Sequence, residues 1–250
     1  MGVDPAAYAA AVRSAQDRVI DTQQERVREA ADLITECLRN GGIVQVFGSG
    51  HSEATAMEIV GRAGGLVPTN RLALRDAVVF GGEPPELLHD DRLERDPDIA
   101  RRILAVHRID PSDVFVVVSQ SGINGSVVEL ARLVRERGHR LIAITSLQHT
   151  ARVAPRHPSG QRLTELADVV LDNGAPYGDA VLPLPGGGAI GAISSITAAL
   201  LAQLIVAEVV RRLLDSGERP PVYLSANVPD GDEHNRILEQ RYAGRIRRTA

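Results

Sequence analysis

The sequence predicts an α/β fold in which a parallel sheet lies between two layers of helices, as a three-layer αβα sandwich. Short apolar runs rich in β-branched residues, of which Val114–Val118 is the clearest, alternate along the chain with helical patterns. Such alternation is typical of βαβ units. Aromatic residues make up only 3% of the 250 residues, whereas hydrophobic residues make up 44%. The core must therefore be built from aliphatic side chains, which suits strands that are buried on both faces.

We expect a single domain over residues 1–250, because no repeat, linker or low-complexity segment divides the chain. Residues 1–40 carry apolar side chains at helical spacing and predict an N-terminal helix, which the pair Gly41-Gly42 ends. The core spans about residues 41–214. Residues 215–250 form a polar C-terminal extension, with a helix expected at Glu233–Ile246.

The core elements follow one another in the order expected of a parallel sheet. They are a strand at Ile43–Phe47, a helix from Ala54 to the Gly64-Gly65 pair, an extended stretch at Leu66–Leu74, a strand at Val114–Val118, a helix at Ser126–Arg137, strands at Leu141–Thr145 and Val169–Leu171, and an apolar helix at about Ile193–Leu214. The segment Gly81–Asp98 is rich in glycine, proline and acidic residues and predicts a long loop. Long loops in compact domains are usually functional or mobile.

Composition and charge exclude several classes of function. The net charge of −4 argues against nucleic acid as a partner, and the basic stretch Arg241–Arg248 is only local. The single cysteine, Cys37, predicts a buried thiol rather than a disulfide or a cysteine cluster for zinc. The uncharged stretch Ala189–Ala207 contains glycine, serine and glutamine, so we interpret it as a core helix rather than a membrane span. No signal peptide opens the sequence, so a soluble, cytoplasmic protein is expected.

Two serine-containing loops follow predicted strands and lead into predicted helices. They are Gly48–Ser52 and Ser119–Ser126. Ligands of open parallel sheets bind beyond the carboxyl ends of the strands, and a helix N-terminus favours an anion there. Helix capping alone is the alternative, but a cap needs one residue rather than a cluster. A nucleotide-binding loop is disfavoured, since Glu53 occupies the place of the third fingerprint glycine. The loops therefore predict a phosphate site.

The second loop carries the motif of a known family. The run Ser119-Gln120-Ser121-Gly122 follows a valine-rich strand and is preceded in the chain by a Gly-x-Gly-x-Ser loop. In this the sequence resembles the sugar isomerase (SIS) domain over roughly Ile34–Leu214. It looks most like a stand-alone branch related to phosphoheptose isomerases and N-acetylmuramic acid 6-phosphate etherases, because only about forty residues precede the first strand.

The resemblance implies a five-stranded, flavodoxin-like parallel sheet and a homo-oligomer, dimer or tetramer, with active sites near the subunit boundaries. It also implies a sugar 6-phosphate as the ligand. By analogy with the isomerase domain of glucosamine-6-phosphate synthase, the phosphate is assigned to Ser52, Ser119, Gln120, Ser121 and Asn124. The same loops add Ser49, His51 and Ser126 to the predicted binding residues.

The family's enzymes begin by removing the proton at C2 of the sugar, for which a carboxylate or histidine is suited. Glu58 lies in a Glu-x-x-Gly-Arg pattern that resembles phosphoheptose isomerases, although alignment from Ser52 without gaps places Arg62 at the family glutamate. Glu94 resembles the catalytic glutamate of the etherases in its spacing ahead of Ser121. His89 offers an acid in the same loop. Each of these residues could instead be a solvated side chain.

The choice of reaction depends on the last core helix. Phosphoheptose isomerases use a histidine there, and the predicted helix at Ile193–Leu214 has none. This favours an etherase-like lyase or dehydratase, which eliminates water at C3 of an (N-acetyl)amino sugar 6-phosphate. An aldose–ketose isomerase and a non-catalytic phosphosugar sensor remain as alternatives. Neither a metal nor another cofactor is required for such chemistry. The polar clusters around Asp179 and at Asp230–Asn235 are left without a role.

Overall fold

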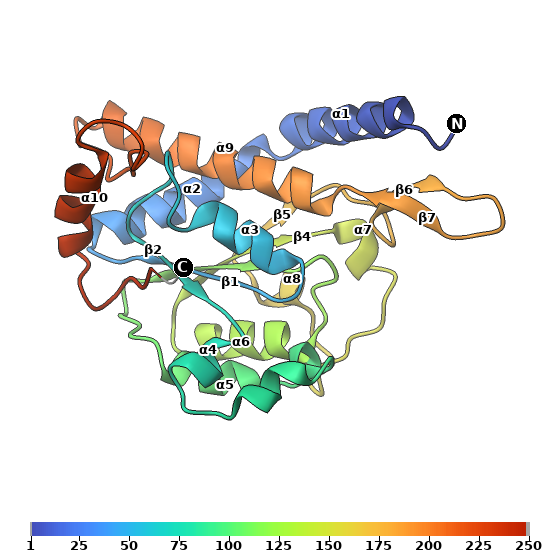
Figure 1. The fold of residues 1–250 in the computed structure, drawn as a ribbon, viewed down its shortest axis with the longest axis horizontal. Helices are drawn as coiled ribbons and strands as arrows, with labels where there is room; N and C mark the ends of the chain where they lie inside the picture. Colours follow the sequence, from blue (N-terminus) through green and yellow to red (C-terminus); the bar gives the residue numbers. More distant parts are fainter. Residues whose placement is uncertain (1, 249–250) are drawn as a thin grey trace.

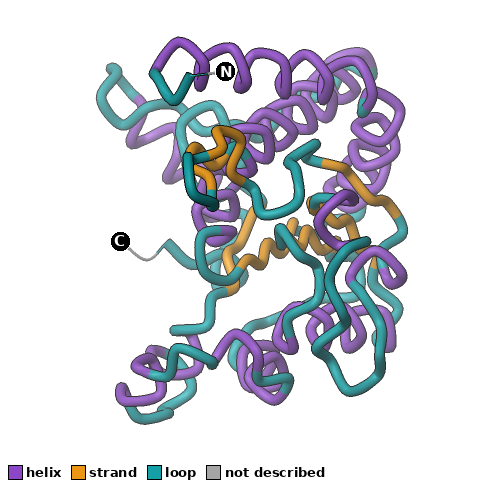
Figure 2. The backbone as a smooth tube through the Cα atoms, turned by 90° about the vertical axis from the view of Figure 1, so that its right-hand side faces the viewer, coloured by secondary structure: helices purple, strands orange, loops and turns teal. Residues whose placement is uncertain are grey.

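The computed structural model describes residues 2–248 and confirms the predicted sandwich (Figure 1). Five strands form one parallel sheet in the order β2-β1-β3-β4-β5. Their bounds are β1 Val44–Gly48, β2 Thr69–Leu72, β3 Val114–Val118, β4 Arg140–Thr145 and β5 Val169–Asp172. The sheet lies between two groups of helices, as the view along a perpendicular direction also shows (Figure 2).

The two helical layers bury opposite faces of the same strands. One layer contains α1 (Pro5–Thr22), α2 (Gln24–Arg39), α3 (Ser52–Ile59) and α9 (Ser194–Asp215). The other contains α4 (Asp76–Val79), α5 (Asp98–Ala105), α6 (Gly125–Glu136) and α8 (Leu163–Leu166). Val116 packs towards the first layer and Phe115 towards the second, because successive strand side chains point to opposite faces. The aliphatic, nearly continuous apolar strands of the sequence are explained by this double burial.

The N-terminal segment forms two helices where one was predicted. The break is at Gln23, whose backbone N–H bonds to Val19 while its side-chain Oε1 accepts from the N–H of Asp172. Thr22 also bonds back to the carbonyl of Arg18, a contact that competes with regular helix geometry. The break therefore allows the segment to change direction and anchor on the end of β5.

The predicted loop 81–98 is partly ordered into two short 3-10 helices, Pro85–His89 and Leu93–Arg95. Leu93 is buried in the core and fixes the second of them. A short helix, α7 (Leu147–Thr150), follows β4. These elements matter for function because they carry side chains to the carboxyl edge of the sheet.

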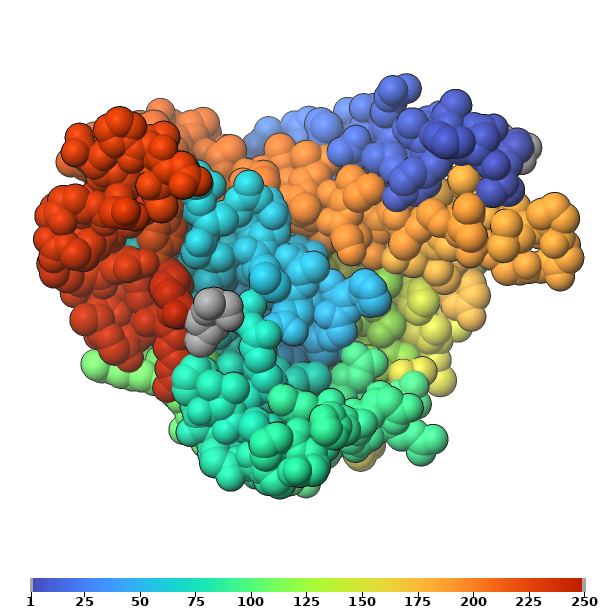
Figure 3. All heavy atoms as spheres, viewed as in Figure 1, coloured from blue at the N-terminus to red at the C-terminus, as the bar shows by residue number. Residues whose placement is uncertain are grey.

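The stretch predicted as a single core helix from Ala189 begins instead as a strand. β6 (Ala180–Pro183) and β7 (Ala189–Ala192) form an antiparallel hairpin, and α9 starts only at Ser194. Gly191, within that stretch, has a positive φ of 80°, which the regular right-handed helix does not allow, so the helix cannot begin before it. The hairpin projects from the body at the end opposite α10 (Gly231–Gln240), as Figure 3 shows. Among the described helices, none is both long and apolar enough to cross a bilayer.

The C-terminal extension is more compact than predicted. The helix expected at 233–246 is α10, which ends at Gln240, and the basic tail that follows is not a helix end. Arg248 bonds to the carbonyls of Val67 and Thr69, and Arg245 pairs with the buried Asp113. The tail thus lies along the edge strand β2 and joins it, through Asp113, to the start of β3. Asn235, in the cluster left without a role, bonds the backbone of Leu224 and so holds the extension together.

Cys37 is buried, as predicted. Burial raises the pKa of its thiol to about 12, so the sulfur stays protonated.

Candidate functional site

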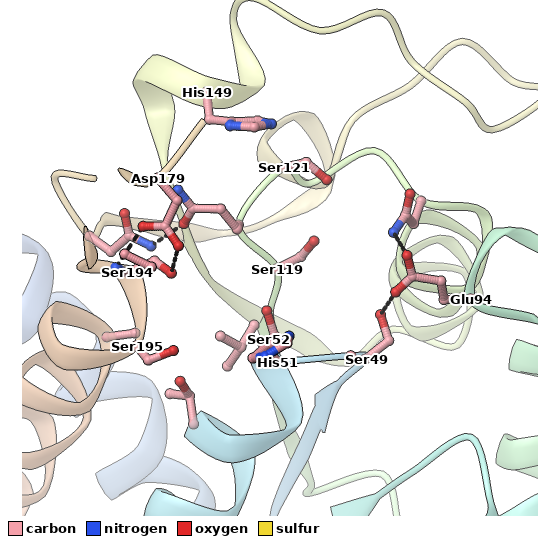
Figure 4. A pocket seen from close by; sticks show the side chains of 18 residues that line it. Ser49, His51, Ser52, Glu94, Ser119, Ser121, His149, Asp179, Ser194 and Ser195 are labelled. Carbon is pink, nitrogen blue, oxygen red and sulfur yellow. Dashed lines mark hydrogen bonds between the residues drawn. The ribbon is translucent and has the colours of Figure 1, made fainter. Parts of the chain in front are cut away.

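A cavity of about 510 Å³ lies beyond the carboxyl ends of the strands (Figure 4). It is lined by Ser49, Gly50, His51, Ser52, Thr55, Glu94, Val118, Ser119, Gln120, Ser121, Asn124, His149, Asn173, Asp179, Ala192, Ser194, Ser195 and Ala198. The loops that follow β1, β3, β4 and β5 all contribute, as expected for a parallel sheet.

The first loop turns tightly from β1 into α3. Gly48 has no room for a side chain, since a Cβ there would lie 2.4 Å from the carbonyl oxygen of Ser52. Gly50 has a positive φ of 55°, which favours glycine. The turn therefore places His51 and Ser52 at the start of α3, with both residues lining the cavity.

The second loop turns from β3 into α6 in a similar way. The hydroxyl of Ser119 accepts a hydrogen bond from the N–H of Gly122, at 3.1 Å, and Gly122 has a positive φ of 64°. At Gly125 a Cβ would lie 2.1 Å from the carbonyl oxygen of Arg95, so only glycine lets α6 begin so close to the Glu94 segment. Gly122 thus allows the turn of this loop, and Gly125 allows the loop to pack closely against the segment that carries Glu94.

Helix capping does not account for the serines. Neither α3 nor α6 has a side-chain cap hydrogen bond. Within residues 2–248 the hydroxyls of Ser52 and Ser121 have no hydrogen-bond partner, although both line the cavity. Two helix N-termini and a set of unused donors therefore converge on one space, an arrangement that suits an anion.

Glu94 is the predicted catalytic residue that the structure brings to the cavity. Its Oε1 accepts from Asn124 Nδ2 at 2.9 Å and its Oε2 accepts from Ser49 Oγ at 3.3 Å. The carboxylate therefore bridges the two loops, as Figure 4 shows. Ser126 is buried and does not line the cavity. Its hydroxyl donates to the backbone oxygen of Glu94 at 2.7 Å and so holds the segment that carries the carboxylate.

Glu58 and His89 are not brought to the cavity. Glu58 pairs with Arg62 and accepts from Gln203 Nε2 at 2.9 Å. It lies six residues along α3 from Ser52, which is about 9 Å at the rise of an α-helix, so it is well behind the anion-facing end. His89 is exposed on the first 3-10 helix. The predicted roles of these residues have no geometric support at this site.

The wall opposite Glu94 was not predicted from the sequence. Asp179 has a positive φ of 69°, and its carboxylate accepts from the N–H groups of Ile193 and Ser194 and from the Ser194 hydroxyl, at 3.1, 2.8 and 2.7 Å. It therefore neutralises the N-terminus of α9, leaving α3 and α6 as the helices open to an anion. The sequence did offer one indication: the loops that follow β4 and β5 must reach the same edge of a parallel sheet as the two serine-containing loops.

A second unpredicted residue orients Gln120. Asn173 Oδ1 accepts from the N–H of Ala175 at 3.0 Å, so its amide Nδ2 faces Gln120 and donates to Oε1 at 2.7 Å. The Gln120 Nε2 group then remains as a donor. It is buried and has no partner among the described residues. A buried unpaired donor is costly, so this group is available to a ligand that offers an acceptor in the cavity.

The charges around the cavity are unusual for an anion site. No arginine lines it, and the chain contains no lysine at all. The titratable lining groups are Glu94, Asp179, His51 and His149. Burial lowers the pKa of His149, and the nearby Asp179 opposes that effect only in part. An anion would therefore be held by N–H groups, hydroxyls and helix dipoles rather than by a fixed cation. Residues 2–248 also present no group of three metal-ligating side chains.

A family model described as "SIS domain" matches residues 7–146. A UPF0309 protein of Listeria monocytogenes is 39% identical over 237 residues, which cover 94% of this chain and 95% of the relative. A UPF0309 protein of Halalkalibacterium halodurans is 39% identical over 231 residues, covering 90% of this chain and 91% of the relative.

Solved structures share the fold at lower identity. A phosphoheptose isomerase from Francisella tularensis aligns with a TM-score of 0.54 and 18% identity, covering 82% of this chain and 95% of its own. Phosphoheptose isomerase GmhA from Neisseria gonorrhoeae gives 0.53 and 21%, covering 82% and 96%. An Escherichia coli protein in complex with A5P gives 0.51 and 16%, covering 85% and 89%.

Proposed function

This chain belongs to the SIS domain family, and from that premise we propose that it binds a sugar 6-phosphate and removes the proton at C2. The observation that carries the proposal is the position of Glu94. Its carboxylate is tied to Ser49 and Asn124, one residue from each hydroxyl-bearing loop, at the wall of the cavity. A phosphate held by those loops would place the attached sugar within the same cavity as the carboxylate.

The phosphate is proposed to sit between the N-termini of α3 and α6. The free hydroxyls of Ser52 and Ser121 and the Nε2 donor of Gln120 support this position, together with His51, Ser119 and Asn124 along the same edge. Hydrogen bonds to a charged group are stronger than those between neutral groups, so several donors can replace a fixed cation. The role of Ser126 is then to support Glu94 rather than to bind phosphate.

We propose that Glu94 acts as the base on the open-chain form of an (N-acetyl)amino sugar 6-phosphate. The C2–H bond breaks, its proton moves to the carboxylate, and its electrons form an enolate with the C1 carbonyl. The C3–O bond then breaks as the hydroxyl accepts a proton and leaves as water, which gives a C2=C3 double bond. The carboxyl that took the C2 proton can return it to the leaving oxygen, so the step needs no other reactant.

An aldose–ketose isomerase is the second candidate. Of the two carboxylates that line the cavity, Asp179 is engaged by three donors at the start of α9, which leaves Glu94 as the carboxylate base. In isomerisation Glu94 would carry the proton from C2 to C1, while the proton of the C2 hydroxyl moves to O1 of the enediolate and the carbonyl forms at C2. The two reactions share the removal of the C2 proton and differ in the steps that follow it.

The organisation of the protein forms part of the proposal. The two main clusters of buried apolar residues cover the two faces of one sheet, which supports a single domain. We propose a cytoplasmic homo-oligomer, a dimer or tetramer, with the cavity near a subunit boundary. Sedimentation of the purified chain would test the assembly.

The test is incubation with hexose and N-acetylhexosamine 6-phosphates in deuterated water, followed by mass spectrometry. Loss of water from an N-acetylhexosamine 6-phosphate is expected. Unchanged mass apart from deuterium at the reacting carbons would establish the isomerase instead. Binding without exchange or conversion would show a sensor, and absence of both binding and turnover would overturn the proposal.

A further inference from the structure

His149 lines the cavity from α7, on the far side of the second loop from Glu94. Figure 4 shows its imidazole on the side of the cavity where Ser121 lies, whereas Glu94 is drawn on the other side of the view. The residue is half-buried. His149 therefore shares the cavity with the second loop but stands apart from the proposed base.

The tautomer of His149 is set by the backbone. Its Nδ1 accepts a hydrogen bond from the N–H of Gly178 at 3.1 Å, so Nδ1 carries no proton and the neutral ring carries its proton at Nε2. If Nδ1 were protonated, its N–H would face the N–H of Gly178 and this hydrogen bond would be lost. Burial also favours the neutral ring, since it lowers the pKa of the imidazole.

The orientation of the ring is set by packing. The imidazole stacks on Tyr177, with ring centroids 5.3 Å apart and an angle of 29° between the planes. The guanidinium of Arg152 lies 5.8 Å from the Tyr177 ring centroid. Tyr177 is held in turn, because its N–H donates to Gln148 Oε1 at 2.9 Å. The charged groups on the elements around the imidazole are Asp179, which favours its protonation, and Arg152, whose guanidinium lies against Tyr177.

We propose that His149 is a phosphate ligand that donates from Nε2 in its neutral form. Its Nε2 has no hydrogen-bond partner among residues 2–248, and a ring fixed at both Nδ1 and its face can present that donor without further ordering. The donor would close the phosphate site from the α7 side, opposite the N-termini of α3 and α6. This inference rests on the proposed phosphate site and adds a residue that lies outside both serine loops.

In this role the imidazole of His149 carries no charge. A protonated histidine would act as the missing cation, and binding would then take up a proton. A neutral donor takes up none, so the number of protons bound at His149 is the same in the free and the bound protein.

Binding of inorganic phosphate and of glucosamine 6-phosphate to wild type, His149→Phe and His149→Gln, measured by calorimetry in buffers of different ionisation enthalpy, tests the proposal. His149→Phe keeps a ring to stack on Tyr177 but removes the donor, and should lower the affinity for both ligands by about tenfold or more. His149→Gln can place an amide N–H near the position of Nε2 and should recover part of that loss.

The outcomes separate this inference from the proposed function. If the wild type binds neither ligand, the phosphate site itself fails. If it binds both and His149→Phe binds them equally well, only the role of His149 fails. Weakening of glucosamine 6-phosphate alone would place the contact on the sugar and overturn the assignment to phosphate. Imidazole ¹⁵N spectra of the phosphate-bound wild type should show the neutral Nε2–H tautomer, and a protonated ring would contradict it.

Discussion

The two ends of the sheet both gather polar side chains, but they use them differently. At the amino ends of the strands, Asp113 accepts from the N–H of Ile43, from Gln45 Nε2 and from Arg245. At the carboxyl ends, the hydroxyls of Ser52 and Ser121 have no partner among the described residues. The carboxylate at the amino end finds several donors among residues 2–248, whereas the two hydroxyls at the carboxyl end are available to a ligand.

The amino-end cluster continues across the sheet. Gln45 and Asn70 are almost fully buried within β1 and β2, and Asn70 Nδ2 donates to Gln45 Oε1 at 3.0 Å. His107 lies against Asn70 and contacts Asp76 at 2.8 Å through its other ring nitrogen. Because buried polar groups are costly without partners, this cluster stabilises the fold only as a connected whole. The comparison predicts that changes at one end alter stability and changes at the other alter binding.

The largest effect is expected from Asp113→Ala. It removes a buried carboxylate that accepts from Gln45 and from the backbone N–H groups of Ile43 and Asp110 and that pairs with Arg245, so the free energy of unfolding should fall by about 3–5 kcal/mol. Urea unfolding would measure the loss. Asp232→Ala, which removes an exposed carboxylate of α10, serves as the control and should change stability by less than about 0.5 kcal/mol. An equal loss in both variants would remove the distinction between the clusters.

Ser121→Ala should show the reverse pattern. It removes a hydroxyl that makes no hydrogen bond within the described protein, so stability should be nearly unchanged while affinity for a sugar phosphate falls by about 1.5–3 kcal/mol. Thermal unfolding with and without ligand separates the two quantities. Ser14→Ala, at an exposed position of α1, is the matched control. Loss of stability without loss of affinity would show that Ser121 is structural.

Asn173 is expected to have a smaller effect, because it acts through Gln120. Asn173→Ala frees the Gln120 amide to rotate and should weaken sugar phosphate binding by about 0.5–1.5 kcal/mol. Asn173→Asp should weaken it further, since a carboxylate would draw the Gln120 Nε2 away from the phosphate. Titration calorimetry of both variants tests the order. Equal affinity in the two would mean that the orientation of Gln120 is not set by this contact.

The smallest effect is expected at Asp168, a largely buried carboxylate whose arginine partners are exposed. Asp168 accepts from the N–H of Leu141 at 2.8 Å and pairs with Arg135 and Arg140. Burial alone would raise the pKa of this carboxyl, but the hydrogen bonds and the arginines outweigh it and hold the pKa below its ordinary value. Its contribution to stability should be present near neutral pH and disappear as the pH falls through the lowered pKa. Unfolding of Asp168→Asn across pH 2–7 should therefore converge with wild type at the acid end.

The sequence predicted the parts of the molecule that depend on local signals. β3 is apolar throughout and was placed at its observed bounds, and the two loops were found because glycine and serine follow strands. Glu94 was predicted because its spacing ahead of Ser121 resembles that of the catalytic glutamate in the etherases. The three-layer sandwich followed from the alternation of strands and helices alone.

The remainder depends on contacts between distant segments. Asp179 lines the cavity only because a hairpin that local pattern could not predict returns it to α9. His149 and Asn173 follow β4 and β5, whose loops have no glycine–serine motif to mark them. Glu58 was predicted from a resemblance to the Glu-x-x-Gly-Arg pattern, which gives no distance from the sheet edge, and Ser126 because it shares a loop with lining residues. The amino-end cluster joins Gln45 to Asp113 across two strands.

The central claim is that the open polar cavity holds a sugar phosphate with C2 against Glu94. Loss of the C2–H signal of an N-acetylhexosamine 6-phosphate in deuterated water, followed by NMR, tests it most directly, because both elimination and exchange remove that signal. Wild type and Glu58→Gln should lose it at similar rates, whereas Glu94→Gln should be slower by about 10²–10⁴-fold with its substrate affinity largely kept. Loss of the signal at the wild-type rate in Glu94→Gln, or its retention in Glu58→Gln alone, would contradict the account.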